Sequence, residues 1–582
     1  MLMNYSIFDF SLEINKTTVH QICIQDLSNI ERRVLKDSFV TYIYFNLLKG
    51  NVYIGETKDF CTRHDQHMRE NHFLDGMFDR CLVIYNATKF TESHVKDLEF
   101  MLINHMFAEI DETNFKLFNR NNGQVQPIYN GHNEMVQIFV KLWEKDLFEK
   151  DLVFTRKLSK IRNKILFKYS PFKQLSQQQL ECEEEIIKSI HNKHIVIGGA
   201  GTGKTILLMS LMYKLINNNS NLRIGIVTTG NLTDKFNRVL KQLNLAGKLK
   251  FERAGQLIKR AKQEKIVFDI ILVDESHRLQ RYYPKGHPAT KKHFNKNEPS
   301  INELHLLEEV SKGIVLFYDQ FQSIRPQDIL RKDFKKQTVS YNEYNLNQQF
   351  RIKSNIINNE EFDGASFVKG ILYALNITNE RDFDPSVFKY KNKDSYFQIV
   401  NSISELFKFT NEMEKLHANT TNRVIAGYTK EWKSNPRSRQ NKRIERSQLP
   451  FDWIEGSTGW HWNSQHEKWV ELESSKKEIG SIHAIQGADI DYAGVIIGND
   501  ITINNKGRIV GVKENYKDTG GTPLIEGFNE EEFTDYILNI YYILLTRGIE
   551  GCKVYFEDPK VRKHFVKKIS EGKSTSKISS YR

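Results

Sequence analysis

Two hydrophobic patterns divide the chain into a short N-terminal part and a longer C-terminal part. Near the N-terminus, aromatic and β-branched residues at 40–45 and 52–55 flank the turn segment 47–51, which predicts a β-hairpin. Beyond residue 190, short apolar runs end in glycine or polar residues, as at 195–197 and 268–273. Such runs are typical of strands buried on both faces of a parallel sheet. The pattern predicts an α/β chain that begins with a small α+β domain.

Two helices are predicted to follow the hairpin. Arg63 and His67 are four residues apart, so they share one face of the first helix. The second helix, at 95–103, carries Glu99 beside an apolar stripe. These polar residues are the candidate functional residues of the N-terminal part.

The glycine-rich segment after the strand at 195–197 has the G-x-x-x-x-G-K-T pattern of a phosphate-binding loop. Glycines let backbone N–H groups turn towards phosphate oxygens, and the following helix points its positive end at the same anion. Lys204 can reach the outer phosphates, and the Thr205 hydroxyl can hold Mg²⁺. The pattern therefore predicts a site for a nucleoside triphosphate, with ATP as the expected ligand. Its residues are Gly198, Gly199, Ala200, Gly201, Thr202, Gly203, Lys204 and Thr205.

Adjacent carboxylates follow the apolar run at 268–273. Asp274 can hold Mg²⁺ through water, and Glu275 can polarise the attacking water. Two other segments carry weaker signals. The polar end of the strand at 222–229 could contact a nucleic-acid backbone, and Gln179, ahead of the loop, could read the adenine edge.

Composition narrows the class of protein. The 582 residues are 39% hydrophobic and 27% charged, which fits a globular protein, and the net charge of +12 favours an anionic partner such as nucleic acid. The five cysteines are scattered without a C-x-x-C pair, so neither a zinc site nor a disulfide framework is expected. With no apolar run of about 18 residues and no evident signal peptide, we expect a cytoplasmic protein without a membrane span.

Later segments resemble the ordered motifs of superfamily 1 helicases. Asp319 and Gln322 follow the apolar run at 313–318, and the segment 346–351 ends in Arg351. The resemblance implies that Gln322 senses the γ-phosphate of ATP and that Arg351 reaches the phosphates. It also implies two RecA-like domains with ATP between them.

Two segments near the C-terminus extend this resemblance. The segment 480–489 is similar to the fifth helicase motif, and 539–548 is similar to the sixth. The resemblance implies that Arg547 is an arginine finger. The wording of the motifs looks most like the DUF2075 branch, which is also similar to the Schlafen helicase-like region. The fifth motif adds Gln486 and Gly487 to the candidate nucleotide-binding residues.

The N-terminal hairpin and the polar residues after it resemble the GIY-YIG nuclease family. The resemblance implies cleavage of DNA with one divalent metal, Mg²⁺ or Mn²⁺, held by Glu99. Tyr44 and Tyr53 would be the paired tyrosines, and one of them would be the general base. Arg63 would neutralise the scissile phosphate, and His67 would relay a proton or position water. Asn119 is a weaker candidate for the residue that closes this site. Two departures stand out: Tyr42 occupies the place of the name-giving glycine, and Tyr44 and Tyr53 lie closer together than is usual for the family.

The expected organisation has a GIY-YIG-like nuclease domain at 1–130, a charged helical connector at 131–170, and RecA-like domains at 171–345 and 346–582. The leading hypothesis is an ATP-dependent DNA endonuclease and helicase-like translocase, placed by analogy in restriction or anti-phage defence. Two alternatives remain open. One is an ATP-gated nucleic-acid-binding switch that does not unwind, and the other is a nuclease that cuts RNA.

Overall fold

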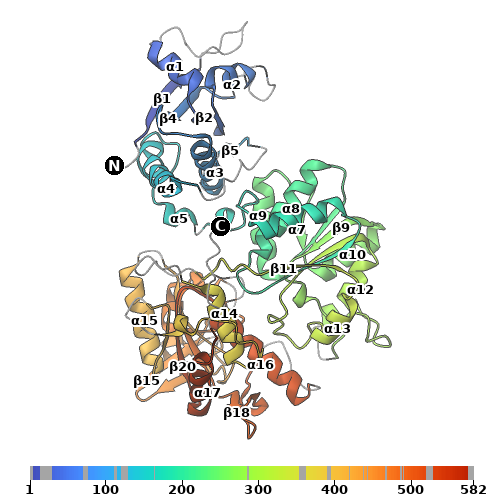
Figure 1. The fold of residues 1–582 in the computed structure, drawn as a ribbon. Coiled ribbons are helices and arrows are strands. Elements are labelled where there is room, and N and C mark those ends of the chain that lie inside the picture. The colour runs from blue at the N-terminus through green and yellow to red at the C-terminus, as the bar shows by residue number, and fades with distance from the viewer. Residues whose placement is uncertain are drawn as a thin grey trace. The chain divides into compact units, whose positions relative to one another are not determined.

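A computed structural model describes most of the chain (Figure 1). The described residues divide into two compact units. The first contains Met1–Leu180, Met209–Asn218 and Lys235–Lys248, and the second contains Glu181–Leu208, Asn219–Asp234 and Leu249–Arg582. The residues described are 4–12, 29–67, 69, 77–109, 115–119, 129–162, 164–284, 288–352, 362–389, 395–417, 420–436, 438, 440–441, 443–465, 468–485, 488, 490–518 and 528–573.

The first unit is built on a sheet with the strand order β1-β4-β2-β3-β5, drawn in blue in Figure 1. Its neighbouring strands are antiparallel, except that β3 and β5 are parallel. The hairpin expected from the sequence is present as β2 and β3. The elements are β1 (Ser6–Ser11), α1 (Asn29–Asp37), β2 (Val40–Asn46), β3 (Asn51–Thr57), α2 (Phe60–His67), β4 (Arg80–Tyr85), α3 (Glu92–Glu109) and β5 (Lys116–Leu117).

The charged segment expected to be a connector packs against α3 instead of standing apart. The Asn104 side chain donates to the carbonyl oxygen of Phe172 at 2.9 Å. The buried carboxylate of Glu109 accepts from Lys164 at 2.8 Å and from two backbone N–H groups, at Phe154 and Thr155. These contacts place the segment within the N-terminal unit. Its elements are α4 (His132–Lys141), the π-helical turn η4 (Leu142–Leu147), α5 (Leu158–Arg162), α6 (Ile165–Lys168) and the first turn of α7 (Gln177–Lys188).

The second unit contains a parallel sheet with the strand order β11-β6-β10-β9-β7-β8. The apolar runs of the sequence form its central strands, which are buried as expected. The helices and strands of this part of the chain are β6 (Lys193–Gly198), α8 (Lys204–Asn218), β7 (Ile224–Val227), α9 (Gly230–Gln242), β8 (Phe251–Glu252), α10 (Ala254–Glu264), β9 (Phe268–Val273), η5 (Ser276–Arg278), α11 (Pro288–Lys291), α12 (Glu303–Glu308), β10 (Ser311–Tyr318), α13 (Arg331–Gln337) and β11 (Asn342–Leu346). Only the first residues of α8 and α9, up to Leu208 and Asp234, belong to the second unit.

A second sheet in this unit has the order β12-β20-β17-β13-β16-β15-β14 and is parallel except for the β14–β15 pair. These two sheets confirm the α/β expectation for the C-terminal part. The elements are α14 (Gly364–Ala374), η6 (Pro385–Phe388), β12 (Phe397–Ile399), α15 (Ile403–Leu416), β13 (Asn422–Ala426), η7 (Arg446–Gln448), β14 (Trp453–Glu455), β15 (Thr458–Trp462), η8 (Trp469–Glu471), η9 (Glu473–Lys477), β16 (Glu478–Ser481), β17 (Ile490–Ile497), β18 (Ile501–Ile503), β19 (Ile509–Gly511), η10 (Lys513–Asn515), α16 (Glu530–Leu545), β20 (Gly548–Phe556) and α17 (Pro559–Ile569).

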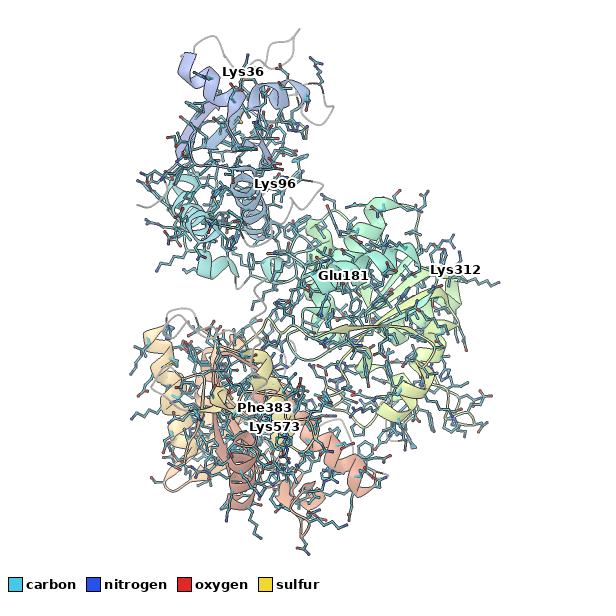
Figure 2. All side chains as sticks on the ribbon, in the orientation of Figure 1. Lys36, Lys96, Glu181, Lys312, Phe383 and Lys573 are labelled. Atoms are coloured by element: carbon cyan, nitrogen blue, oxygen red, sulfur yellow. The ribbon has the colours of Figure 1, made fainter. Side chains whose placement is uncertain are left out.

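The last described residues pack against the segment that contains Arg381 and Phe383. The backbone nitrogen of Lys573 donates to the carbonyl oxygen of Arg381 at 2.8 Å, beside the buried ring of Phe383 (Figure 2). Within the described residues, no helix is long and apolar enough to span a bilayer.

Candidate functional site

The phosphate-binding loop connects the end of β6 to the start of α8. Gly201 and Gly203 have backbone φ angles of +80° and +79°, a region that residues with a Cβ rarely adopt. The Thr202 hydroxyl donates to the Gly199 carbonyl oxygen at 3.1 Å, and this bond joins two residues within the loop. The glycine spacing of the sequence is therefore required by the backbone path of the loop.

Lys204 lies across the loop at the first residue of α8. Its Nζ donates to the carbonyl oxygens of Gly198 at 2.6 Å and Gly199 at 2.9 Å, and it lies 3.7 Å from a carboxylate oxygen of Asp319. That oxygen also accepts from the side-chain amide of Gln322 at 2.7 Å. The lysine and the expected γ-phosphate sensor are thus connected through one carboxylate.

Thr205, in the first turn of α8, faces Asp274, which directly follows β9. The Thr205 hydroxyl lies 3.3 Å from a carboxylate oxygen of Asp274, which is 3% exposed. Burial raises the pKa of Asp274 to about 7, and the neighbouring charge of Glu275 adds to the rise. A buried carboxylate whose anion is disfavoured, beside a hydroxyl, fits the oxygen ligands that Mg²⁺ prefers. Among the described residues, no group of three or more histidine, cysteine or acidic side chains is placed to hold a metal ion.

Glu275 is held in an unusual backbone conformation by its neighbours. Its φ of 50° is uncommon for a residue with a side chain, and such strain clusters at functional sites. His277 Nε2 lies 3.0 Å from the Glu275 carboxylate, while its Nδ1 accepts from the backbone nitrogen of Asp319 at 3.4 Å. Burial alone would raise the pKa of Glu275, but the charge and hydrogen bond of His277 lower it. The sequence did not single out His277, although it lies two residues after the carboxylate pair.

Residues that follow β11 and a residue of α16 also reach the loop. The backbone nitrogen of Phe350 donates to the Gly201 carbonyl oxygen at 2.8 Å, and a Cβ added to Gly201 would lie 2.5 Å from the Cβ of Arg351. Arg351 is therefore beside the loop, and its contact with the phosphates stays a prediction. In α16, the Tyr542 hydroxyl accepts from the backbone nitrogen of Ala200 at 3.3 Å.

Four further residues were predicted for the nucleotide site: Arg547, Gln486, Gly487 and Gln179. Arg547 follows α16 and donates from Nη1 to the Ala488 carbonyl oxygen at 3.2 Å. Gln486 and Gly487 lie outside the described residues. Gln179 is 3% exposed, and its side-chain oxygen accepts from the backbone nitrogen of Ser176 at 2.8 Å. The Gln179 side chain thus takes part in the start of α7, and its expected contact with adenine stays a prediction.

In the N-terminal unit, one face of the sheet gathers the aromatic and histidine residues. The Tyr42 hydroxyl lies 2.8 Å from His67 Nε2, and the ring of Tyr53 lies 5.1 Å from that of His67, centroid to centroid. Tyr42 crosses the strand pair above Gly55, where an added Cβ would lie 2.3 Å from the phenolic oxygen. The Tyr42 side chain therefore leaves no room for a side chain at position 55, which explains why Gly55 is a glycine.

Tyr44, which the sequence predicted as one of the paired tyrosines, lies deeper than Tyr42. It is 0% exposed, and its hydroxyl lies 2.6 Å from His64 Nδ1. Burial raises the pKa of Tyr42 well above its ordinary value, Tyr53 and Glu99 add to the rise, and Arg63 opposes it. Tyr42 is therefore the tyrosine that shares its surroundings with the other predicted residues. Spacing in the sequence could have identified Tyr42. The paired tyrosines of the family are farther apart than Tyr44 and Tyr53, and Tyr42 is farther from Tyr53 than Tyr44 is.

Glu99 lies on α3 facing this cluster. Burial raises its pKa to about 8, Glu56 adds to the rise, and Lys96 and Arg63 oppose it. The Asn119 side-chain amide pairs with both backbone groups of Ile54, at 3.0 Å and 2.7 Å. It extends the sheet edge beside the cluster.

Residues 192–558 match the family model described as Schlafen group 3, DNA/RNA helicase domain. The uncharacterized protein YPL245W of Saccharomyces cerevisiae is 24% identical over 400 residues, which are 64% of this chain and 83% of that protein. Among solved structures, Pif1 helicase from Candida albicans is 11% identical with a TM-score of 0.27, covering 68% of this chain and 99% of that one. The DUF1998 helicase MrfA bound to DNA and AMPPNP is 10% identical with a TM-score of 0.32, covering 69% and 52%.

Proposed function

Because the chain belongs to the Schlafen group 3 family of DNA/RNA helicase domains, we propose that it is a helicase-like ATPase that acts on nucleic acid. The observation that carries the proposal is the convergence of Lys204, Thr205 and Asp274 at the carboxyl ends of parallel strands. Ligands of open parallel sheets bind at that edge. The net charge of +12 supports a polyanionic partner.

In the proposed reaction, the loop amides and Lys204 bind the triphosphate and withdraw negative charge from it. Thr205 and Asp274 would hold Mg²⁺, which supplies further neutralisation of phosphate charge when bound. Glu275, fixed by His277, orients the attacking water and accepts its proton. Gln322 and Arg351, which follow β10 and β11, and Arg547, which precedes β20, are the groups that would respond to the γ-phosphate.

The test is steady-state ATP hydrolysis with matched single-stranded DNA, duplex DNA and RNA. At least one of these nucleic acids is expected to increase the rate of ATP hydrolysis by the wild-type protein. Lys204→Ala is expected to reduce that rate at least 100-fold in all conditions. Lys259→Ala, an exposed change on α10, is the matched control. Absence of stimulation by every nucleic acid would overturn the proposal. Strand displacement that requires Lys204 would distinguish a translocase from an ATP-gated switch.

The N-terminal cluster favours a second activity, cleavage of a phosphodiester by a GIY-YIG-like nuclease. Arg63 would neutralise the scissile phosphate, and Glu99 would hold the divalent ion. Tyr42 and His67, joined by a hydrogen bond, would take the proton of the attacking water. A nuclease fused to a motor is the arrangement found in restriction and anti-phage defence, so we place the chain there by analogy. The substrate is DNA in this proposal, with RNA as the alternative.

Cleavage of labelled DNA and RNA in Mg²⁺ or Mn²⁺, with and without ATP, tests this second activity. Glu99→Gln and Arg63→Ala are expected to abolish cutting and to leave ATP hydrolysis intact. Glu92→Gln, an exposed change at the start of the same helix, is expected to cut normally. Loss of both activities in Glu99→Gln would mean that the cluster supports folding and is not a nuclease site.

A further inference from the structure

The turn between β2 and β3 carries two leucines where a hairpin usually has glycine or polar residues. Residues 47–50 read Leu-Leu-Lys-Gly, between the paired strand ends Asn46 and Asn51. Turns favour glycine, asparagine and aspartate, because these residues fit the turn backbone. Leu48 is instead 97% exposed, the highest fraction among the exposed large hydrophobic side chains that the structure describes, and Leu47 is 38% exposed. A binding partner that takes up these side chains would explain their position.

The backbone of this turn is held at both of its ends. The Asn46 side-chain oxygen accepts from the backbone nitrogen of Lys49 at 2.9 Å. Gly50 has a φ of +67°, and its carbonyl oxygen accepts from the backbone nitrogen of Lys116 in β5 at 2.6 Å. Leu48 therefore extends from a segment that is already ordered, and little conformational entropy is lost when it enters a partner.

A further exposed apolar side chain is linked to the turn through β5. Phe115, which precedes Lys116, packs its ring 5.8 Å from that of Phe154, centroid to centroid. Phe154 is 57% exposed, and its backbone nitrogen donates to the buried carboxylate of Glu109 at 2.8 Å. Apolar side chains scattered singly over a surface are ordinary, but these surround the start of one short strand. The turn surface is defined by Leu47, Leu48, Lys49, Lys116 and Phe154.

The charge of the turn surface favours a nucleic acid as its partner. Lys49 and Lys116 are exposed, and neither of the segments 46–52 and 115–119 contains a carboxylate. Lysines attract phosphates, and an aliphatic side chain beside them can enter between stacked base pairs. Bases of a single strand stack mainly on aromatic rings, whereas apolar wedges such as leucine act on a duplex. The most exposed side chain here is aliphatic, so a duplex fits better than a single strand.

Strand β3 connects the turn surface to the proposed nuclease site. Asn51 and Gly55 are four residues apart on it, which separates them by about 13 Å at about 3.3 Å per residue. Gly55 is the residue that lies against the Tyr42 side chain. Because base pairs are stacked about 3.4 Å apart, this distance corresponds to roughly four base pairs. One short duplex is therefore long enough to reach both the turn surface and the nuclease site.

We propose that Leu48 inserts from the minor groove between two base pairs of a nucleic-acid duplex, while Lys49 and Lys116 contact the flanking phosphates. Insertion of an apolar side chain partly unstacks the base step and bends the duplex. Pyrimidine–purine steps unstack most easily, so this contact selects duplexes by their deformability. The inference rests on the proposed nuclease function, and it adds the form of substrate that the N-terminal unit takes.

The experiment uses the full chain and a set of duplexes that carry the fluorescent base 2-aminopurine at one pyrimidine–purine step. Its fluorescence rises when the neighbouring bases unstack. The wild type is expected to raise it several-fold, and Leu48→Ala is expected to remove most of this rise. Leu48→Met keeps an apolar wedge and is expected to retain the rise. The matched control is Leu416→Ala, which changes a leucine that is 69% exposed at the end of α15.

Cleavage of the same duplexes gives a second measurement. Leu48→Ala is expected to cut a fully paired duplex several-fold more slowly than the wild type. A mismatch at the same step lowers the cost of unstacking, so Leu48→Ala is expected to cut that duplex at nearly the wild-type rate. Leu48 is exposed, and an unchanged thermal midpoint would verify that Leu48→Ala is folded.

The outcomes separate the insertion from the nuclease function. If the wild type cuts no nucleic acid, the nuclease function fails, and the fluorescence of the bound duplex still decides the insertion. If the wild type cuts duplexes and Leu48→Ala equals it in fluorescence and cutting, only the insertion fails. Weaker binding of Leu48→Ala with an unchanged fluorescence rise would also overturn insertion. A wild-type dimer in sedimentation that Leu48→Ala converts to a monomer, with fluorescence unchanged, would assign the turn surface to a second copy of the chain.

Discussion

The hydroxyl of Tyr542 accepts a hydrogen bond from the backbone nitrogen of Ala200 at 3.3 Å, so helix α16 touches the phosphate-binding loop directly. Its ring also packs edge-on against Phe321, near the loop that carries Gln322. Asn539, one turn earlier on the helix, donates to the Ser323 carbonyl oxygen at 3.1 Å. The helix that precedes Arg547 is thus connected to both phosphate-facing loops of the first sheet.

Tyr542→Phe is expected to lower the turnover number for ATP more than it changes KM. The ring stays in place, but the loop no longer has its hydrogen bond to α16, a change on the order of 1 kcal/mol. That corresponds to a reduction in rate of roughly two- to tenfold. Tyr536→Phe is the matched control, because it removes a buried hydroxyl from the same helix that bonds Tyr516 instead. Equal effects of the two variants on ATP hydrolysis would show that the contact with Ala200 has no specific role.

The contact between His277 and Glu275 leads to a second prediction. His277→Ala removes the group that orients the Glu275 carboxylate, and misplacement of a catalytic group by about 1 Å can cost about 100-fold in rate. We therefore expect the turnover number to fall between about 10- and 100-fold with little change in KM for ATP. His277→Gln places a side-chain amide where it can still donate to Glu275 and is expected to restore part of the rate. A similar reduction in both variants would indicate that His277 acts only through packing.

Sequence spacing specifies the residues of a phosphate loop more tightly than those of the N-terminal cluster, for a physical reason. Phosphate loops need glycines at fixed positions and a lysine at the helix start, so spacing alone locates Lys204 and Thr205. A strand pair has a period of two, so Tyr42 and Tyr44 lie on the same face, and spacing does not say which reaches the polar residues. Only the packing of α2 and α3 decides that Tyr42 lies beside Arg63.

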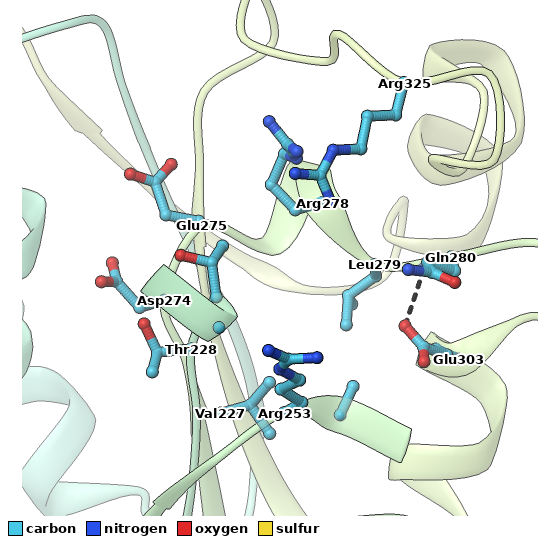
Figure 3. A pocket seen from close by; sticks show the side chains of 13 residues that line it. Val227, Thr228, Arg253, Asp274, Glu275, Arg278, Leu279, Gln280, Glu303 and Arg325 are labelled. Atoms are coloured by element: carbon cyan, nitrogen blue, oxygen red, sulfur yellow. Dashed lines mark hydrogen bonds between the residues drawn. The ribbon is translucent and has the colours of Figure 1, made fainter. Parts of the chain in front are cut away.

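The sequence also predicts some strands of the fold and misses others. Long apolar runs predicted the buried parallel strands, whereas the edge strand β1 and the short pair β14–β15 carry no comparable signal. A cavity beside the carboxylates of Asp274 and Glu275 was also beyond sequence reasoning (Figure 3). The arginines that line it, Arg253, Arg278 and Arg325, come from three separate segments, and only the folded sheet brings them to one edge.

The two tyrosines of β2 provide a third prediction. Tyr42→Phe is expected to reduce nucleic-acid cleavage at least tenfold, because its hydroxyl is bonded to His67 and lies within reach of the Arg63 and Glu99 charges. Tyr44→Phe removes a hydroxyl that is bonded to His64 in the core, so it is expected to lower the thermal midpoint and leave cleavage near normal. The measurement is single-turnover cleavage by protein shown to be folded. The opposite order of effects would restore Tyr44 as the functional tyrosine.

Asp500 makes the stability of the second sheet depend on pH. It is 1% exposed, accepts a hydrogen bond from the Tyr541 hydroxyl, and has its pKa raised by burial from 3.8 to about 7. Glu557 adds to that rise, while Tyr541 and Lys430 oppose it. The folded state therefore keeps a proton that the unfolded state has released between about pH 4 and 7. The contribution of Asp500 to the free energy of unfolding is thus greatest at low pH and falls as pH rises through that window.

Asp500→Asn keeps the shape of the side chain and an acceptor for Tyr541 but cannot ionise. The difference in thermal midpoint, variant minus wild type, is therefore expected to increase from pH 5 to pH 8 and to level off above about pH 7. The corresponding difference in the free energy of unfolding changes by at most about 1.4 kcal/mol per pH unit within the window, since one pKa unit corresponds to that energy. Asp382→Asn removes an exposed carboxylate that pairs with Lys369, and its difference is expected to stay flat over the same range. A flat difference for Asp500→Asn as well would mean that Asp500 is ionised in the folded protein and that its charge is balanced by Lys430.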